Sequence, residues 1–164
     1  MITQLDACSS LFLREVSEIR ESGLRVVIEE GRTADTPEDI NINGVTISGT
    51  YEVKHDDLCR VFEIAWDSYI SYSVTNESYA QPEEKPICYT GDRVRRYTRS
   101  AFLDYVRRAT FATAEYPGLF EHIALICERH IIDVISISEP RVSLLKAARP
   151  RSVKAAQPGS PPDG

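Results

Sequence analysis

The sequence predicts one α+β domain in residues 1–145, an antiparallel sheet of about five strands with two amphipathic helices packed on it. Apolar and polar side chains alternate in 45–74 and 120–137, which indicates strands because successive strand residues point to opposite faces. Residues 146–164 are rich in proline, glycine, serine and basic side chains, and such a composition cannot build a core. We therefore expect a disordered C-terminal tail.

The first quarter of the chain predicts a helix, a strand and a loop. Apolar residues recur at three- and four-residue spacing in 4–22, which favours a helix ending at a C-cap at Gly23. Residues 24–28 are β-branched and apolar, as in a short strand. The acidic stretch 29–42 contains Gly31 and Pro37 and is predicted to be a loop. The apolar positions of the predicted helix are Leu5, Cys8, Phe12, Val16 and Ile19.

The middle of the chain predicts a long hairpin. Residues 45–54 alternate cleanly, and 59–76 keep one parity through Phe62 and Val74. One strand bent or bulged near 67–68 explains that continuity. We expect these two segments to pair with each other.

The second half predicts a helix between a loop and a second hairpin. Residues 77–92 form a surface loop with a short strand at 87–89, and Ser100 is the expected N-cap of the second helix. Two β-rich runs around Arg129 and His130 predict a hairpin. Both of its faces are apolar, which suggests a central place in the sheet.

Composition bounds the class of protein. The chain is 42% hydrophobic and 27% charged, as in ordinary globular proteins. It has no run approaching the roughly 18 apolar residues of a membrane helix, and its N-terminus lacks the features of a signal peptide. The four cysteines form no CxxC pair, which argues against a disulfide framework or structural zinc. We expect a soluble, cytoplasmic protein with no cofactor.

Charge is unevenly distributed along the chain. Residues 1–92 carry 7 Lys and Arg against 18 Asp and Glu, a net −11, whereas residues 93–164 carry 12 against 7, a net +5. Either the two halves pair across the fold, or they mark two faces with different partners. The overall pI of about 5.1 argues against broad nucleic-acid binding.

Arginines crowd the start of the second predicted helix. The guanidinium group is a planar fork of donors suited to phosphate or carboxylate, so an anionic ligand is one possible partner of this cluster. Solvation of a helix, or pairing with the acidic half, is the commoner role of such a charge run. The candidate anion-binding residues are Arg93, Arg95, Arg96 and Arg99, with Arg107 and Arg108 further along.

Catalytic signals are weak. His122 and Asp133 fall on the two arms of the second hairpin, and a histidine oriented by a carboxylate is what general base catalysis needs. No nucleophile motif accompanies them, and a buried histidine with one hydrogen bond is the commoner situation. The acidic turn at 55–57 with Asp67 matches no calcium loop, so no metal site is predicted.

Aromatic residues near the long strand favour a protein partner. Tyr69 has the parity of the polar face, and Glu77 and Tyr79 follow nearby. Together with the acidic half and the lack of a catalytic motif, they favour a non-catalytic protein-binding module for a basic partner, such as an acidic inhibitor or immunity-type protein. The alternatives are an anionic-ligand binder at 93–108 and a small hydrolase or transferase using His122 and Asp133.

Overall fold

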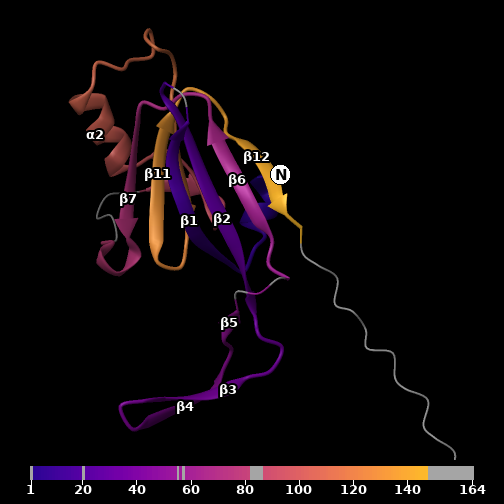
Figure 1. Ribbon diagram of the computed structural model, residues 1–164. Coiled ribbons are helices and arrows are strands. Elements are labelled where there is room, and N and C mark those ends of the chain that lie inside the picture. Colours follow the sequence, from indigo (N-terminus) through magenta and orange to yellow (C-terminus); the bar gives the residue numbers. More distant parts are fainter. Residues whose placement is uncertain (1, 20, 55, 57, 82–86, 148–164) are drawn as a thin grey trace, which may run out of the picture.

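The computed structural model describes residues 2–19, 21–54, 56, 58–81 and 87–147. These residues form two five-stranded antiparallel sheets, a separate two-stranded hairpin and two short α-helices (Figure 1). The first sheet contains β1 (Ser10–Ile19), β2 (Gly23–Thr33), β5 (Val53–Lys54), β6 (Val61–Trp66) and β12 (Arg141–Lys146). The second contains β7 (Ser71–Asn76), β8 (Cys88–Thr90), β9 (Val94–Arg99), β10 (Glu121–Ile126) and β11 (His130–Ser136).

The remaining elements lie outside the two sheets. They are α1 (Ile2–Asp6), the hairpin strands β3 (Glu38–Ile42) and β4 (Val45–Thr50), a 3₁₀ turn η1 (Glu77–Tyr79) and α2 (Ala101–Ala109). The first sheet has the order β1-β2-β6-β12, with β5 paired to the end of β2, and the second has the order β7-β11-β10-β9-β8.

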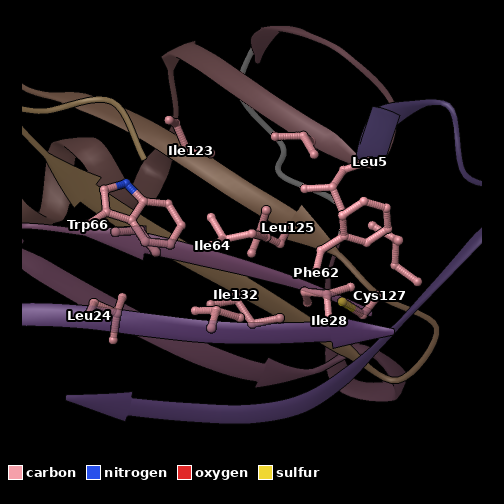
Figure 2. Close-up of a cluster of buried hydrophobic side chains, with 14 of the residues drawn as sticks. Leu5, Leu24, Ile28, Phe62, Ile64, Trp66, Ile123, Leu125, Cys127 and Ile132 are labelled. Carbon is pink, nitrogen blue, oxygen red and sulfur yellow. The ribbon is translucent and has the colours of Figure 1, made fainter. Parts of the chain in front are cut away.

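The main core lies between the two sheets. Alternate residues of β2 and β6 face inward from the first sheet, and alternate residues of β10 and β11 meet them from the second (Figure 2). The fully or almost fully buried side chains include Leu24, Val26, Ile28, Phe62, Ile64, Trp66, Ile123, Leu125, Ile132 and Val134. The two-residue period of these strands therefore arises because each strand turns one face into the core of a β-sandwich.

Helix α1 closes one end of the sandwich. Its Leu5 is fully buried in the main core, and the Asp6 carboxylate turns back to the loop that precedes β9. Asp6 Oδ1 accepts hydrogen bonds from the backbone N–H groups of Asp92, Arg93 and Val94 at 2.8, 2.7 and 2.9 Å. One carboxylate thus fastens the N-terminus to the second sheet.

Helix α2 covers the outer face of the second sheet. Leu103 and Val106 pack on Ile135 of β11, with Phe102 and Phe120 beside them. The predicted N-cap is confirmed, because Ser100 Oγ accepts a hydrogen bond from the Leu103 N–H at 3.0 Å.

The predicted first helix is wrong beyond Asp6. Residues 10–19 form β1, which pairs along its whole length with β2, and Gly23 begins β2 instead of capping a helix. A register shift between Leu13 and Glu15 explains the misleading spacing, because the bulged residue moves the inward parity from Leu13 to Val16. A bulged strand then has the three-residue apolar spacing of a helix.

The predicted long hairpin is also wrong. Segment 45–50 pairs with β3, which lies in the stretch 29–42 that was expected to be a loop, while β6 pairs with β2 and β12. The predicted bend near 67–68 is the point where the chain crosses to the second sheet, and β7 pairs there with β11.

The second half agrees better with the sequence. A short strand forms at 88–90, α2 follows Ser100, and β10 and β11 form the expected hairpin with β10 central in its sheet. The chain is predominantly β, so the α+β class holds only in outline, and the described residues contain twelve strands instead of about five.

The end of the described chain holds one more strand. β12 occupies Arg141–Lys146, at the edge of the first sheet, and was not predicted. The rest of the predicted disordered tail, 148–164, lies outside the described residues. Among the helices described, none has the length and apolar character needed to span a membrane.

Candidate functional site

A two-stranded arm projects from the end of the sandwich where β2 and β5 meet (Figure 1). It consists of β3 and β4, residues 38–50, joined by a tight turn at Asn43 and Gly44. Both turn residues have positive φ, 51° and 85°, as a type I′ hairpin requires. Neither strand pairs with a third strand, so the arm is a separate two-stranded sheet.

One face of the arm is aliphatic and uncovered. Ile40 stands opposite Ile47, and Ile42 stands opposite Val45, so the four side chains lie on the same face. They are 44%, 46%, 53% and 64% exposed in that order. An isolated hairpin is marginally stable in water, and four clustered β-branched side chains on one exposed face are characteristic of a contact surface.

The arm is also acidic. Residues 33–53 contain no lysine or arginine and four carboxylates, Asp35, Glu38, Asp39 and Glu52. Asp39 Oδ1 accepts a hydrogen bond from the Gly49 N–H at 3.3 Å, and Glu52 lies 3.7 Å from Lys54 at the base. The arm therefore combines an exposed aliphatic face with negatively charged side chains.

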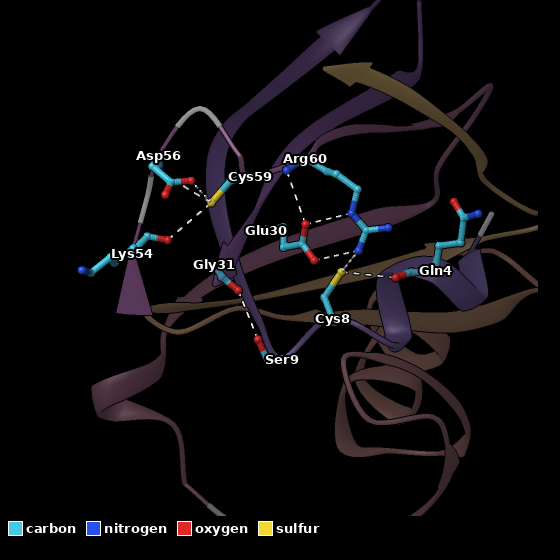
Figure 3. Close-up of polar contacts among 9 residues, drawn as sticks. All are labelled: Gln4, Cys8, Ser9, Glu30, Gly31, Lys54, Asp56, Cys59 and Arg60. Atoms are coloured by element: carbon cyan, nitrogen blue, oxygen red, sulfur yellow. Dashed lines mark hydrogen bonds and ion pairs between the residues drawn. The ribbon is translucent and has the colours of Figure 1, made fainter. Parts of the chain in front are cut away.

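The base of the arm is held by a partly buried ion pair (Figure 3). The Arg60 guanidinium donates two parallel hydrogen bonds to the Glu30 carboxylate, from Nε to Oε2 at 2.8 Å and from Nη2 to Oε1 at 2.7 Å. The hydrogen bonds from Arg60 hold the pKa of Glu30 below its ordinary value. Cys8 Sγ lies 3.5 Å from the same guanidinium and donates to the Gln4 carbonyl at 3.2 Å. This bidentate geometry fixes the point at which the arm leaves the first sheet.

The cysteines at this base are buried and protonated. Burial, reinforced by the Glu30 charge, raises the pKa of Cys8 to about 11, and burial also raises the pKa of Cys59. The Cys59 thiol donates toward the Lys54 carbonyl at 3.4 Å and toward Asp56 Oδ1 at 3.5 Å. A nucleophilic or metal-binding cysteine must be a thiolate, so these two serve as packing groups.

The predicted anion-binding arginines do not converge on one point. Arg95 and Arg99 lie on one face of β9 and Arg96 on the other, because strand residues alternate. Arg96 bonds Glu121 and Glu139, and the Arg95 guanidinium sits 4.6 Å over the ring of Tyr89. The Arg93 side chain reaches the Ser9 carbonyl and Glu128. On α2, Arg107 lies 3.9 Å from Asp104, and Arg108 bonds the Asp104 carbonyl.

His122 and Asp133 are brought together with a third residue that the sequence reading missed. His122 Nε2 lies 2.9 Å from Asp133 Oδ1, and Nδ1 lies 2.8 Å from Ser100 Oγ. An ionised Asp133 can only accept, so Nε2–H donates to it, and in the neutral imidazole Nδ1 then accepts the proton of the Ser100 hydroxyl, whose oxygen also accepts from Leu103 N–H. The ring of Tyr97 stacks on His122 at 4.5 Å.

This chain of bonds has a structural role. Ser100 is 6% and His122 2% exposed, so both are out of reach of a substrate. The Ser100 hydroxyl caps helix α2, and the His122 imidazole is hydrogen-bonded to the Asp133 carboxylate. The network therefore pins the start of α2 to β10 and β11. Its hydrogen bonds run in the same direction as those of a Ser-His-Asp triad, with the two ring nitrogens exchanged, but the Ser100 hydroxyl is buried and also accepts from the Leu103 N–H, whereas a nucleophilic serine is exposed to its substrate.

The predicted partner-binding residues are separated. The Tyr69 hydroxyl donates to Glu18 at 2.7 Å, which raises the pKa of Tyr69 to about 12, and its ring meets Tyr72 edge-on at 5.1 Å. Glu77 and Tyr79 lie in η1, at the other end of β7, where Tyr79 is 81% exposed. Tyr69 and Tyr79 thus belong to different ends of the molecule.

The acidic turn considered for a metal is only partly described. Its residues 55 and 57 lie outside the described residues, and Asp67 bonds Arg141 at 2.6 Å. Among the residues the structure describes, no group of three or more His, Cys, Asp or Glu side chains is arranged to hold a metal ion.

The arm is the surface that sequence reasoning missed. Its signal was present, because an Asn-Gly pair flanked by Ile40, Ile42, Val45 and Ile47 is a strong short-range hairpin pattern. The acidic and proline-containing context of 29–42 concealed the first strand. No protein-family model, curated protein or solved structure matches this chain.

Proposed function

We propose that this protein is a non-catalytic protein-binding module that engages a basic partner through its arm. The observation that carries the proposal is the uncovered aliphatic face of a two-stranded, acidic projection. Such a surface suits an acidic inhibitor or immunity-type protein that covers a basic surface of its target. Four unpaired cysteines fit a reducing, cytoplasmic setting.

The aliphatic face is large enough to matter energetically. Its four side chains together leave about two whole isoleucine or valine side chains exposed. Covering that surface contributes about 3–6 kcal/mol before the costs of association, at ~1.5–3 kcal/mol for each side chain. The arm supplies a central apolar contact, as the core of a binding interface does.

Charge selects the kind of partner. Two copies of the arm facing each other would bring four carboxylates together, Glu38 and Asp39 of each copy, with no lysine or arginine from 38–50 to offset them. Like charges across an interface cost free energy, whereas a basic surface is attracted and its encounter accelerated. A basic protein therefore fits the arm better than a second copy of this chain.

The buried state of the candidate catalytic groups also supports binding over catalysis. Ser100, His122 and Cys127 are each at most 6% exposed, and burial raises the pKa of Cys127 to about 12. The arm, in contrast, has exposed side chains at every position from Glu38 to Ile42.

The test compares the two faces of the arm. The full chain and two variants would be used to capture proteins from a lysate of the source cell, and the captured protein would then be purified and its Kd measured. The variant Ile42→Ser with Val45→Ser changes the aliphatic face, and the control Asn41→Ser with Thr46→Ser changes the opposite face. We expect a basic partner whose Kd rises at least tenfold for the first variant and less than twofold for the control. An acidic partner, or equal binding by both variants, would refute the proposal.

A further inference from the structure

A groove of about 490 Å³ lies where the chain crosses between the two sheets, and we call it the crossover groove. It is bordered by the β1–β2 turn at Ser22, the crossover at Ser68–Ile70, the loop after α2 and Ile137. The arm extends from the end of β2 that is remote from this turn, so the groove and the arm occupy opposite ends of the sandwich (Figure 1). The volume falls in the range of ligand and side-chain binding clefts.

Two exposed aromatic rings form one wall of the groove. Phe111 is 82% and Tyr116 is 66% exposed, and their rings stack with centroids 6.0 Å apart and planes 19° from parallel. The loop that carries them is folded on itself, because Thr113 N–H donates to the Tyr116 carbonyl at 2.6 Å and Thr113 Oγ accepts from the Tyr116 N–H at 3.2 Å. These two bonds fix the backbone of the loop at Tyr116, and the Tyr116 ring stacks on Phe111.

The residues lining the groove are all uncharged, and several of their polar atoms are already used within the protein. The Tyr69 hydroxyl is bound to Glu18, the Ser68 carbonyl accepts from Ser136 Oγ at 2.9 Å, and Thr110 Oγ donates to the Val106 carbonyl at 2.8 Å. What the groove offers to a ligand is therefore chiefly apolar and aromatic surface.

The rim of the groove is acidic. Glu18, Glu21 and Glu115 flank the lining residues Ser22, Tyr69 and Tyr116. Among the described residues, Glu21 and Glu115 form no ion pair, and of the cations on adjoining elements Arg141 is bound to Asp67 and Arg107 lies 3.9 Å from Asp104. An occupant that brings positive charge to this rim is favoured over one that brings negative charge.

We infer that the crossover groove is a docking site for a segment of another protein that inserts a large apolar side chain flanked by lysine or arginine. The apolar side chain would pack on Phe111, Tyr116 and Ile137, and the basic neighbours would face Glu21 and Glu115. A second copy of this chain does not fit as well, because its exposed aliphatic arm is itself acidic. The site is distinct from the arm, so the protein has two contact surfaces at opposite ends.

The test uses a short peptide and the full chain. The probe is an acetylated, amidated Lys-Lys-Phe-Lys-Lys peptide, added to ¹⁵N-labelled protein and followed by ¹H–¹⁵N correlation spectra. We expect saturable shifts at the amides of Ile70, Phe111, Ala112 and Ile137. The same peptide with serine in place of phenylalanine should bind at least fivefold more weakly, and so should the peptide with glutamate in place of lysine.

Matched variants locate the site and separate it from the arm. Phe111→Ser should weaken peptide binding at least fivefold, whereas Tyr79→Ser, which changes an equally exposed ring elsewhere, should not. Ile42→Ser in the arm should bind the peptide as the unchanged protein does, whatever its effect on a partner of the arm. Shifts scattered over the surface, equal binding by Phe111→Ser, or equal binding of an uncharged phenylalanine peptide would each overturn the inference, the last in favour of a small apolar ligand.

Discussion

Replacing Asp6 by alanine should lower the free energy of unfolding by about 2–3 kcal/mol. The Asp6 carboxylate accepts three backbone N–H groups at 2.7–2.9 Å, and hydrogen bonds to a charged group contribute about 1.5–3 kcal/mol each when fully protected. Asp6 is half-exposed, so solvent screening reduces that sum. Val94 is 5% exposed, however, and the loss of its partner leaves a buried N–H group unpaired.

The destabilisation caused by Asp6→Ala should be larger at neutral pH than at acidic pH. Partial burial alone raises the pKa of Asp6, but the hydrogen bonds from Val94, Asp92 and Arg93 outweigh it and hold the pKa below the ordinary 3.8. A carboxylate with a lowered folded-state pKa stabilises the protein fully above its unfolded pKa, and this stabilisation is lost as the pH falls through the folded value. The difference between the natural protein and the variant should therefore be constant near pH 7 and shrink below about pH 4.

Urea unfolding at pH 7 and pH 3 measures both effects. Asp92→Ala is the matched control, because the exposed Asp92 contributes its backbone N–H but no described side-chain bond to the same turn. Equal urea midpoints for Asp6→Ala and Asp92→Ala at pH 7, or a difference between them that persists undiminished at pH 3, would contradict this role of the Asp6 carboxylate.

Three further predictions follow from buried or strained positions. His122→Ala removes a 2% exposed ring that joins the α2 cap to the sheet, and urea unfolding should show a loss of about 3 kcal/mol; a loss below ~1 kcal/mol would contradict the structural role. Gly44→Ala places a side chain at φ +85° with no atom within 4 Å, so strain of about 1–2 kcal/mol should loosen the arm in NMR spectra while the sandwich melts as before. Iodoacetamide at pH 8 should label the exposed Cys88 in the native protein, and mass spectrometry should find Cys8 and Cys127 unmodified, since burial raises their pKa values to about 11 and 12.

The parts of the fold that the sequence predicts are those with local signals. The Ser100 cap is a contact between residues three apart, and β10 and β11 are neighbours joined by a short turn. The pairing of β6 with β2 and β12 joins segments that are far apart in the chain, and a two-residue period carries no information about which strand is the partner. In β1, the bulge near Arg14 also interrupts the two-residue alternation that identifies a strand.

The candidate site shows the same limit. The run of arginines from 93 to 99 looks like one cluster in the sequence, but strand alternation divides it between two faces. The arm had a readable turn, yet the binding role that we propose for it depends on its projecting from the sandwich without a third strand. That isolation is a property of the whole fold and leaves no mark on residues 38–50 themselves.

The uneven charge along the chain takes on a physical meaning in the folded protein. Two arginines of the basic half pair with carboxylates of the same half: Arg96 binds Glu121 and Glu139, and Arg93 lies 3.5 Å from Glu128. Arginines of the acidic half also form ion pairs within their own half: Arg25 pairs with Glu15 and Glu63, and Arg60 pairs with Glu30. Arg141 pairs with Asp67 across the two halves, whereas the arm, residues 38–50, carries Glu38 and Asp39 with no lysine or arginine of its own. The two carboxylates of the arm are placed to attract a basic partner, and for this reason we propose protein binding at the arm over anion binding at the arginines.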